Sequence, residues 1–191
     1  MKKMMKYALV ALMAVAMLFS FASCSDDDDD DDDKVSVSEL TDSQIVDLVA
    51  DGLVAAITTN YSASSSTAAT SDYSSWTLSS SSVTIETTNA YSGSFTEDDC
   101  GTYTVAIGTN STVVVTYILS DDYTSVTGYK VVVSVDATID SVDEDLELTY
   151  DMSDSSATSL TINSNAADIS ETELSTLITT LITGVTTAMY S

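Results

Sequence analysis

Carboxylates are the only side chains in this chain that could do acid–base chemistry in quantity. The 191 residues include 30 Asp and Glu and no His, and all five basic residues are Lys. Without His there is no imidazole to activate a nucleophile, and without Arg there is no bidentate clamp for phosphate. Paired carboxylates can hydrolyse glycosides, but among so many acids a pair at any spacing carries no information. We therefore expect no catalytic residues, no cofactor and no enzyme activity.

One acidic segment has the oxygen ligands of a calcium site. Residues 140–147 read Asp-Ser-Val-Asp-Glu-Asp-Leu-Glu. They lack the Asp-x-Asp-x-Asp-Gly pattern and the turn glycine of an EF-hand loop. From Leu146 onward apolar and polar residues alternate, so we interpret the segment as a polar turn that leads into a strand. We expect no metal site here.

Two surface features could instead serve binding. Trp76 and the ten Tyr residues could stack on sugar rings, although they fit equally well as core or rim residues. Val114, Ile118 and Val132 fall on the otherwise polar side of alternating strands. If these three are neighbours, they form an exposed apolar patch for a partner, unless a segment such as residues 60–75 covers them.

The first residues have the pattern of an export signal. Lys2, Lys3 and Lys6 form a positive start, and residues 7–19 are an unbroken apolar or aromatic run. That length fits a signal peptide, for which roughly 7–15 apolar residues are usual, and is shorter than the ~20 needed to span a bilayer. We expect residues 1–23 to be removed.

The end of this signal, Phe21-Ala22-Ser23-Cys24, resembles the lipobox of bacterial lipoproteins. It matches at the small residues and at the obligatory Cys, with Phe21 where Leu is usual and Ser23 where Gly or Ala is usual. The resemblance implies that Cys24 becomes the mature N-terminus, with a diacylglyceryl thioether on its sulfur and usually a third acyl chain on its amine. Two or more chains make a stable membrane anchor.

A run of eight aspartates follows the lipobox directly. It resembles the export signal of surface lipoproteins of the Bacteroidota, which implies an outer-membrane protein displayed on the cell surface, the periplasmic face being the alternative. The run is also a self-repelling, extended spacer, which over residues 25–37 reaches on the order of 40 Å. The residues of this export signal and tether are Asp26, Asp27, Asp28, Asp29, Asp30, Asp31, Asp32 and Asp33.

Charge and cysteine count restrict the partners further. Removal of residues 1–23 leaves 2 Lys and 30 acidic residues, a net charge of −28. Such a charge repels phosphate backbones, which excludes nucleic acid, and leaves the lipid rather than a basic patch to hold the membrane. Two cysteines suggest a disulfide, but the lipid would use the Cys24 sulfur, so we expect Cys100 to be unpaired and buried.

Two amphipathic helices should flank the folded part. Thr41 and Gln44 fit a capping box that starts a helix of roughly five turns, with an apolar stripe from Ile45 to Ile57. Ser170 and Glu173 fit a second box; the stripe behind it consists of Leu174, Leu177, Ile178, Leu181, Ile182, Val185 and Met189.

Between the helices the period changes from 3.6 to two. The apolar positions alternate from Val83 to Ile162. The short breaks between them, among them a turn predicted at Ser92-Gly93, favour antiparallel neighbours. We predict an α+β domain: an antiparallel meander of six to eight strands with both helices on one face. A β-sandwich with a peripheral helix is the alternative. The expected organisation is a signal peptide (1–23), the lipidated Cys and tether (24–37), and one domain (38–191) with a Ser/Thr-rich loop at 60–75.

These observations favour a lipid-anchored outer-membrane protein that acts as a non-catalytic binding or structural module, with a protein or glycan partner. Two other functions remain open. A periplasm-facing carrier of a small apolar ligand predicts a cavity between sheet and helices. A carboxylate-dependent, glycosidase-like hydrolase predicts two acids that converge in a cleft with unlike environments.

Overall fold

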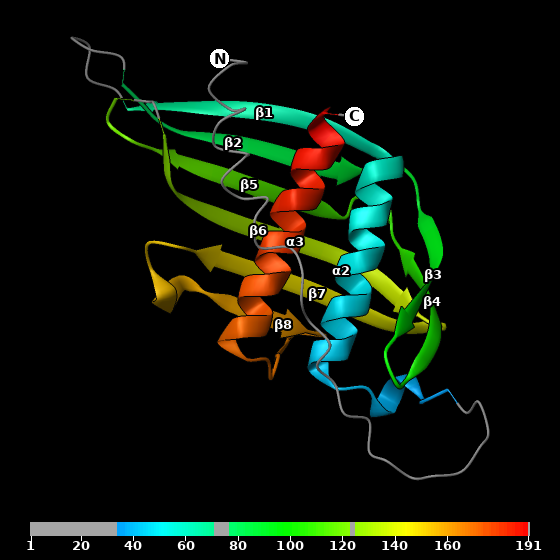
Figure 1. The fold of residues 1–191 in the computed structure, drawn as a ribbon. Helices are drawn as coiled ribbons and strands as arrows, with labels where there is room; N and C mark the ends of the chain where they lie inside the picture. Colours follow the sequence, from blue (N-terminus) through cyan, green and yellow to red (C-terminus); the bar gives the residue numbers. More distant parts are fainter. Residues whose placement is uncertain (1–33, 71–76, 123–124, 191) are drawn as a thin grey trace.

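The protein folds as one antiparallel sheet with two helices across one face, which confirms the α+β prediction (Figure 1). The computed structural model describes residues 34–70, 77–122 and 125–190, with backbone alone at 65–70, 77–81 and 190. In chain order the elements are η1 (Val37–Glu39), α2 (Asp42–Thr59), β1 (Tyr61–Thr70), β2 (Thr77–Thr87), β3 (Tyr91–Glu97), β4 (Gly101–Ile107), β5 (Thr112–Leu119), β6 (Val126–Ile139), β7 (Val142–Asp151), η2 (Ser155–Ala157), β8 (Ser159–Ile162), β9 (Asn165–Ala166) and α3 (Glu171–Tyr190).

The strand order departs from a simple meander. The described strands number nine rather than six to eight, in the order β1-β2-β5-β6-β7-β8-β9. β2 therefore pairs with β5, and the intervening β3–β4 hairpin is displaced to the far end of β6, where Val105 lies opposite Ile139. β6 can pair with both β5 and β4 along one edge because it has 14 residues, whereas β5 has 8.

Two expected breaks in regular structure are strands instead. Residues 60–75 were predicted to be a loop, but Tyr61–Thr70 is β1, paired antiparallel with β2. Ser92 and Gly93 were predicted to be a turn, but both lie inside β3. Pairing with a neighbouring strand satisfies the backbone N–H and C=O groups whatever the side chains are. It can therefore form a strand from residues whose own β-propensity is weak.

The two helices run in the same direction and begin as predicted. Gln44 N donates to Thr41 Oγ1 over 3.3 Å, and Glu173 N donates to Ser170 Oγ over 3.2 Å, which confirms both capping boxes. Near the starts of the helices, Ser43 Oγ donates to Glu173 Oε1 over 2.7 Å.

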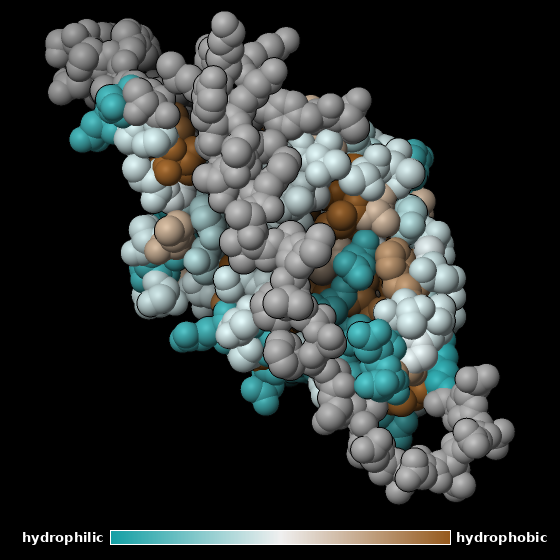
Figure 2. All heavy atoms as spheres, in the orientation of Figure 1, coloured by the Kyte–Doolittle hydropathy of each residue, from teal (hydrophilic) through white to brown (hydrophobic). Residues whose placement is uncertain are grey.

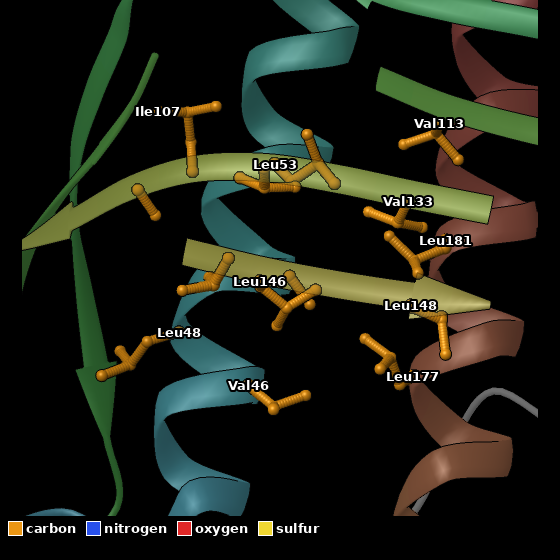
Figure 3. Packing of buried hydrophobic residues seen from close by; sticks show 14 of the residues in the cluster. Val46, Leu48, Leu53, Ile107, Val113, Val133, Leu146, Leu148, Leu177 and Leu181 are labelled. Carbon is orange, nitrogen blue, oxygen red and sulfur yellow. The ribbon is translucent and has the colours of Figure 1, made fainter. Parts of the chain in front are cut away.

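Side chains fill the space between the helices and the sheet. Leu53 from α2 and Leu177 and Leu181 from α3 point toward the apolar faces of β6 and β7 (Figure 3). The fit is close, because a Cβ added at Gly52 would lie 2.8 Å from Val105 Cγ1. On the outside of this helix layer, apolar side chains show as separate patches among polar ones (Figure 2).

Candidate functional site

The residues assigned to lipidation and tethering, Cys24 and Asp26 to Asp33, lie outside the described residues. The structure does describe where the tether meets the domain. Lys34 forms an ion pair with Asp140 in the β6–β7 turn, and its Nζ lies 4.4 Å from the centre of the Tyr103 ring. These contacts fix Lys34 beside β4 and the β6–β7 turn. No signal in the sequence pointed to this junction.

Hydrogen bonds to backbone carbonyls also hold this junction. Val35 N donates to Cys100 O over 3.0 Å. The buried Tyr103 hydroxyl donates to Val35 O over 2.8 Å and to Cys100 O over 2.9 Å. The Lys34 ammonium also lowers the pKa of the Asp140 carboxyl. The first described residues after the acidic run are thus bound to β4 and to the β6–β7 turn.

Cys100 is buried as predicted, but its covalent state differs from the prediction. Its side chain is 2% exposed and its Sγ accepts a hydrogen bond from Gln44 Nε2 over 3.0 Å. The structure has this sulfur in a disulfide, whereas the sequence predicted it unpaired. The other cysteine is Cys24, and one sulfur cannot carry both a lipid thioether and a disulfide.

The sheet face opposite the helices carries the apolar patch expected from the sequence. Val114 on β5 lies directly opposite Val132 on β6, and Val132 is 45% exposed. The segment expected to cover this pair cannot do so as β1, because β1 lies in the same sheet, separated from β5 by β2. The described strands therefore leave Val132 exposed, with the half-buried Val114 beside it.

Ile118 belongs to the same face but sits further along the strands. It lies opposite Gly128, and a Cβ built on Gly128 would be 3.4 Å from Ile118 Cδ1 and 3.9 Å from Met152 Sδ. Met152 is 54% exposed. We call Val114, Ile118, Val132 and Met152 the outer patch. The row of Thr116 and Lys130 divides it into two halves.

Acidic side chains border the outer patch on one side. Asp136 and Asp145 are exposed and lie directly opposite one another on β6 and β7, an arrangement that like charges disfavour. Glu147 lies opposite Ser134 on the same face. The Lys130 ammonium near the centre is already paired with Asp151. The border of the patch is therefore strongly negative.

The acidic segment 140–147 forms a turn and a strand, as predicted. Asp140 and Ser141 have φ of 47° and 74°, which fits a two-residue hairpin turn. Beyond them, Asp145 points to the outer face, whereas Glu144 is buried on the inner face, where Asn163 Nδ2 donates to its Oε2 over 2.9 Å. Within the described residues no three acidic, His or Cys side chains are grouped to hold a metal ion.

The carboxylates of Asp47, Asp51 and Glu97 lie close to one another where α2 meets the end of β3. Burial, with the nearby Asp51 and Glu173 carboxylates, raises the pKa of Asp47 to about 6. Burial, with Asp47, Asp98 and Asp51, raises the pKa of Glu97 to about 7. The pKa is raised in both Asp47 and Glu97. Carboxylate hydrolases instead combine one acid of raised pKa, which donates a proton, with one that stays ionised. These two acids do not show that difference.

The described Tyr side chains of β4, β5, β6 and β7 do not join the outer patch. Tyr117 lies opposite Tyr129 on the helix-facing side of the sheet, and the rings of Tyr129 and Tyr150 are 5.7 Å apart. All three are partly buried against the core. Tyr103 is fully buried. Trp76 lies outside the described residues.

Comparison of the chain with protein-family models, with curated proteins and with solved structures gives no match. Among the described residues no helix is both long and apolar enough to cross a membrane.

Proposed function

We propose that this chain is a lipid-anchored outer-membrane protein, displayed on the cell surface, whose folded domain is a non-catalytic binding module. Its partner is a protein with a basic rim, which docks on the outer patch. The Val114–Val132 pair carries this proposal: Val132 is 45% exposed directly opposite the half-buried Val114, and an exposed apolar patch on a folded domain marks a contact site.

The anchor is supported by the order of the N-terminal features. A positive start, an apolar run and a small-residue segment end at Cys24, and the aspartates follow with one residue between. The tether then enters the domain at Lys34, which Asp140 binds. This attachment positions the start of the folded domain directly after the spacer.

The chemistry of the outer patch favours a protein over a glycan. Its side chains are Val, Ile and Met, whereas sugar rings pack on aromatic faces, and the described Tyr of β5, β6 and β7 face the helices. The acidic border, with Asp136 opposite Asp145, selects positive charge by complementarity. A basic protein surface with an apolar centre satisfies both requirements.

The carrier and hydrolase alternatives have less support. A carrier needs volume between sheet and helices, but that space holds buried side chains, with Gly52 directly against Val105. A hydrolase needs a cleft that holds two acids in unlike states. Asp47 and Glu97 lie instead on the side of the helix layer, and both have raised pKa values.

Protease treatment of intact cells tests the location. We expect digestion of the domain on intact cells, and loss of the protein from the cell fraction in the Cys24→Ala variant. Lysed cells provide the control for intrinsic protease sensitivity. Protection until lysis would contradict surface display and would favour the periplasmic face.

Mass spectrometry of the N-terminal peptide tests the anchor separately. We expect the N-terminal peptide to carry a diacylglyceryl thioether on the Cys24 sulfur. A peptide in which Cys24 is joined to Cys100 would overturn lipidation, because one sulfur cannot form both bonds.

Photo-crosslinking on intact cells tests the outer patch. A photoreactive residue at Val132 is expected to give one discrete protein adduct that weakens as salt is raised, since charge complementarity is screened. The matched control is Ser94, exposed on β3, which should give no such adduct. Equal adducts at both positions, or none at Val132, would rule out docking on the patch.

A further inference from the structure

The outer edge of β1 is a second surface of the sheet that the proposed function does not use. β1 ends the strand order, and among the described residues its backbone pairs with β2 alone. It is ten residues long. A terminal strand of this length presents a row of backbone N–H and C=O groups that can accept another strand.

β1 lacks the devices that usually protect a sheet edge. Its sequence, YSASSSTAAT, contains no charged residue and no Pro, whereas natural edge strands use Lys, Pro or short length to prevent pairing. The other edges differ: β9 has two residues, and β3 lies against α2. The one irregularity in β1 is the register shift at Ala68/Ala69, near its far end.

The distribution of charged residues along the chain indicates which strand would pair with the edge of β1. The chain carries a net charge of −25, but between Asp51 and Glu86 it contains one charged residue, Asp72. Basic partners are attracted to the acidic surfaces elsewhere. Two copies of the chain repel one another over most of their surface, and least along this neutral edge.

The residues of β1 also suit pairing with themselves. Antiparallel pairing of two identical edges about a two-fold axis places Ser, Thr and Ala opposite one another in any register, with no like charges in contact. Ser62, Ala63 and Ser64 are exposed. Their small side chains allow a second backbone to approach. Such pairing would join two nine-stranded sheets into one continuous sheet.

We propose that two copies of the mature chain associate through antiparallel pairing of β1 with β1. The contact is separate from the outer patch and does not require the lipid, because it is made by backbone groups of the folded domain. If Cys24 is lipidated, confinement to one membrane raises the effective concentration of the copies and favours the pairing further.

Sedimentation equilibrium of residues 24–191 over a concentration series tests this proposal. We expect the average mass to rise toward that of a dimer, and to do so more readily at high salt, which screens the acidic repulsion. The Ser64→Lys variant should weaken dimerisation by at least about tenfold, since a lysine on an edge strand opposes pairing with another strand and both copies carry it. Ser94→Lys on β3 is the matched control and should dimerise like the parent.

Hydrogen exchange of the same samples shows where contact occurs and does not depend on the variants. The amides of β1 should become protected as concentration rises, whereas those of β9 should not. Circular dichroism confirms that each variant is folded. A monomer at every concentration and salt, a dimer that both Lys variants disrupt equally, or a dimer in which the β1 amides gain no protection would overturn the proposal.

Discussion

At the scale of single residues, the carboxylates of Asp47 and Glu97 show how burial sets charge. Both lie where α2 meets β3, and the groups that shift their pKa values, among the described residues, are carboxylates rather than cations. Asp151 has the opposite environment: bonds from Lys130 and Ser153 lower its pKa to about 2. The pKa values of these acids therefore differ because of their surroundings and not because of their residue type.

These pKa values predict a pH dependence of stability. Because the folded state raises the pKa of Glu97 to about 7 and of Asp47 to about 6, it binds protons that the unfolded chain releases above pH ~4. The free energy of unfolding should therefore fall as pH rises from about 5 to about 7.5, measured by urea denaturation. Asp151 titrates below this window and should not contribute.

The variant Glu97→Gln supplies the control for the pH prediction. Its stability should change less steeply over the same window, because one of the two titrating groups is gone. Asp98→Asn, an exposed neighbour, should retain more of the slope. Equal slopes in the parent and in Glu97→Gln would show that Glu97 does not titrate with a raised pKa.

The Tyr103 side chain holds the first described residues against β4. Its buried hydroxyl donates to two carbonyls, those of Val35 and Cys100. Tyr103→Phe should lower the free energy of unfolding by about 1–3 kcal/mol, because the half-buried Val35 carbonyl loses the hydroxyl donor, whereas the Cys100 carbonyl keeps the bond from Val35 N–H. Hydrogen exchange should rise at Val35, which lies at the end of the tether. Unchanged exchange there would show that the hydroxyl does not hold the junction.

At the scale of elements, the two faces of one strand have different roles. Along β6, Val131, Val133 and Val135 are buried beneath the helices, whereas Val132 is 45% exposed. Alternation along a strand produces this separation. The burial contributes to stability, and the exposed valine is available for contact.

Adjacent substitutions in β6 test that division. Val133→Ala should cost about 2–3 kcal/mol in unfolding free energy, through lost apolar burial and the cavity left behind. Val132→Ala should change it by no more than about 0.5 kcal/mol. Both are measured by urea unfolding. Similar costs at the two positions would place Val132 in a packed environment and remove it from the outer patch.

At the scale of the whole molecule, one sign of charge dominates. The described residues contain two lysines, and both form ion pairs, with Asp140 and Asp151. The remaining acids are uncompensated by basic side chains and repel one another. The fold therefore depends on its apolar core and its backbone pairing, which oppose this repulsion.

That imbalance predicts a response to salt. Raising the concentration of NaCl should raise the melting temperature of the mature chain, because mobile ions screen repulsion between surface carboxylates. The increase should be larger at pH about 7.5 than at pH about 5, where Glu97 and Asp47 are largely protonated. A melting temperature that falls with salt would show that the ion pairs outweigh the repulsion.

The sequence by itself predicted features that depend on local geometry. Thr41 and Ser170 start helices because their hydroxyls accept bonds from residues three positions on. The alternation of Val131, Val133 and Val135 placed those residues on one face. β3 was missed, although Tyr91 and Phe95 alternate with exposed residues, because Ser92-Gly93 resembled a turn.

The tertiary structure alone decided which segments are neighbours. The period of a strand indicates which face each side chain takes, but it does not name the strand beside it, because pairing depends on packing between residues distant in sequence. The opposition of Val114 and Val132, the β2–β5 pair, the Lys34–Asp140 junction and the open edge of β1 all follow from such pairing. The candidate surfaces of this protein are therefore properties of the folded sheet.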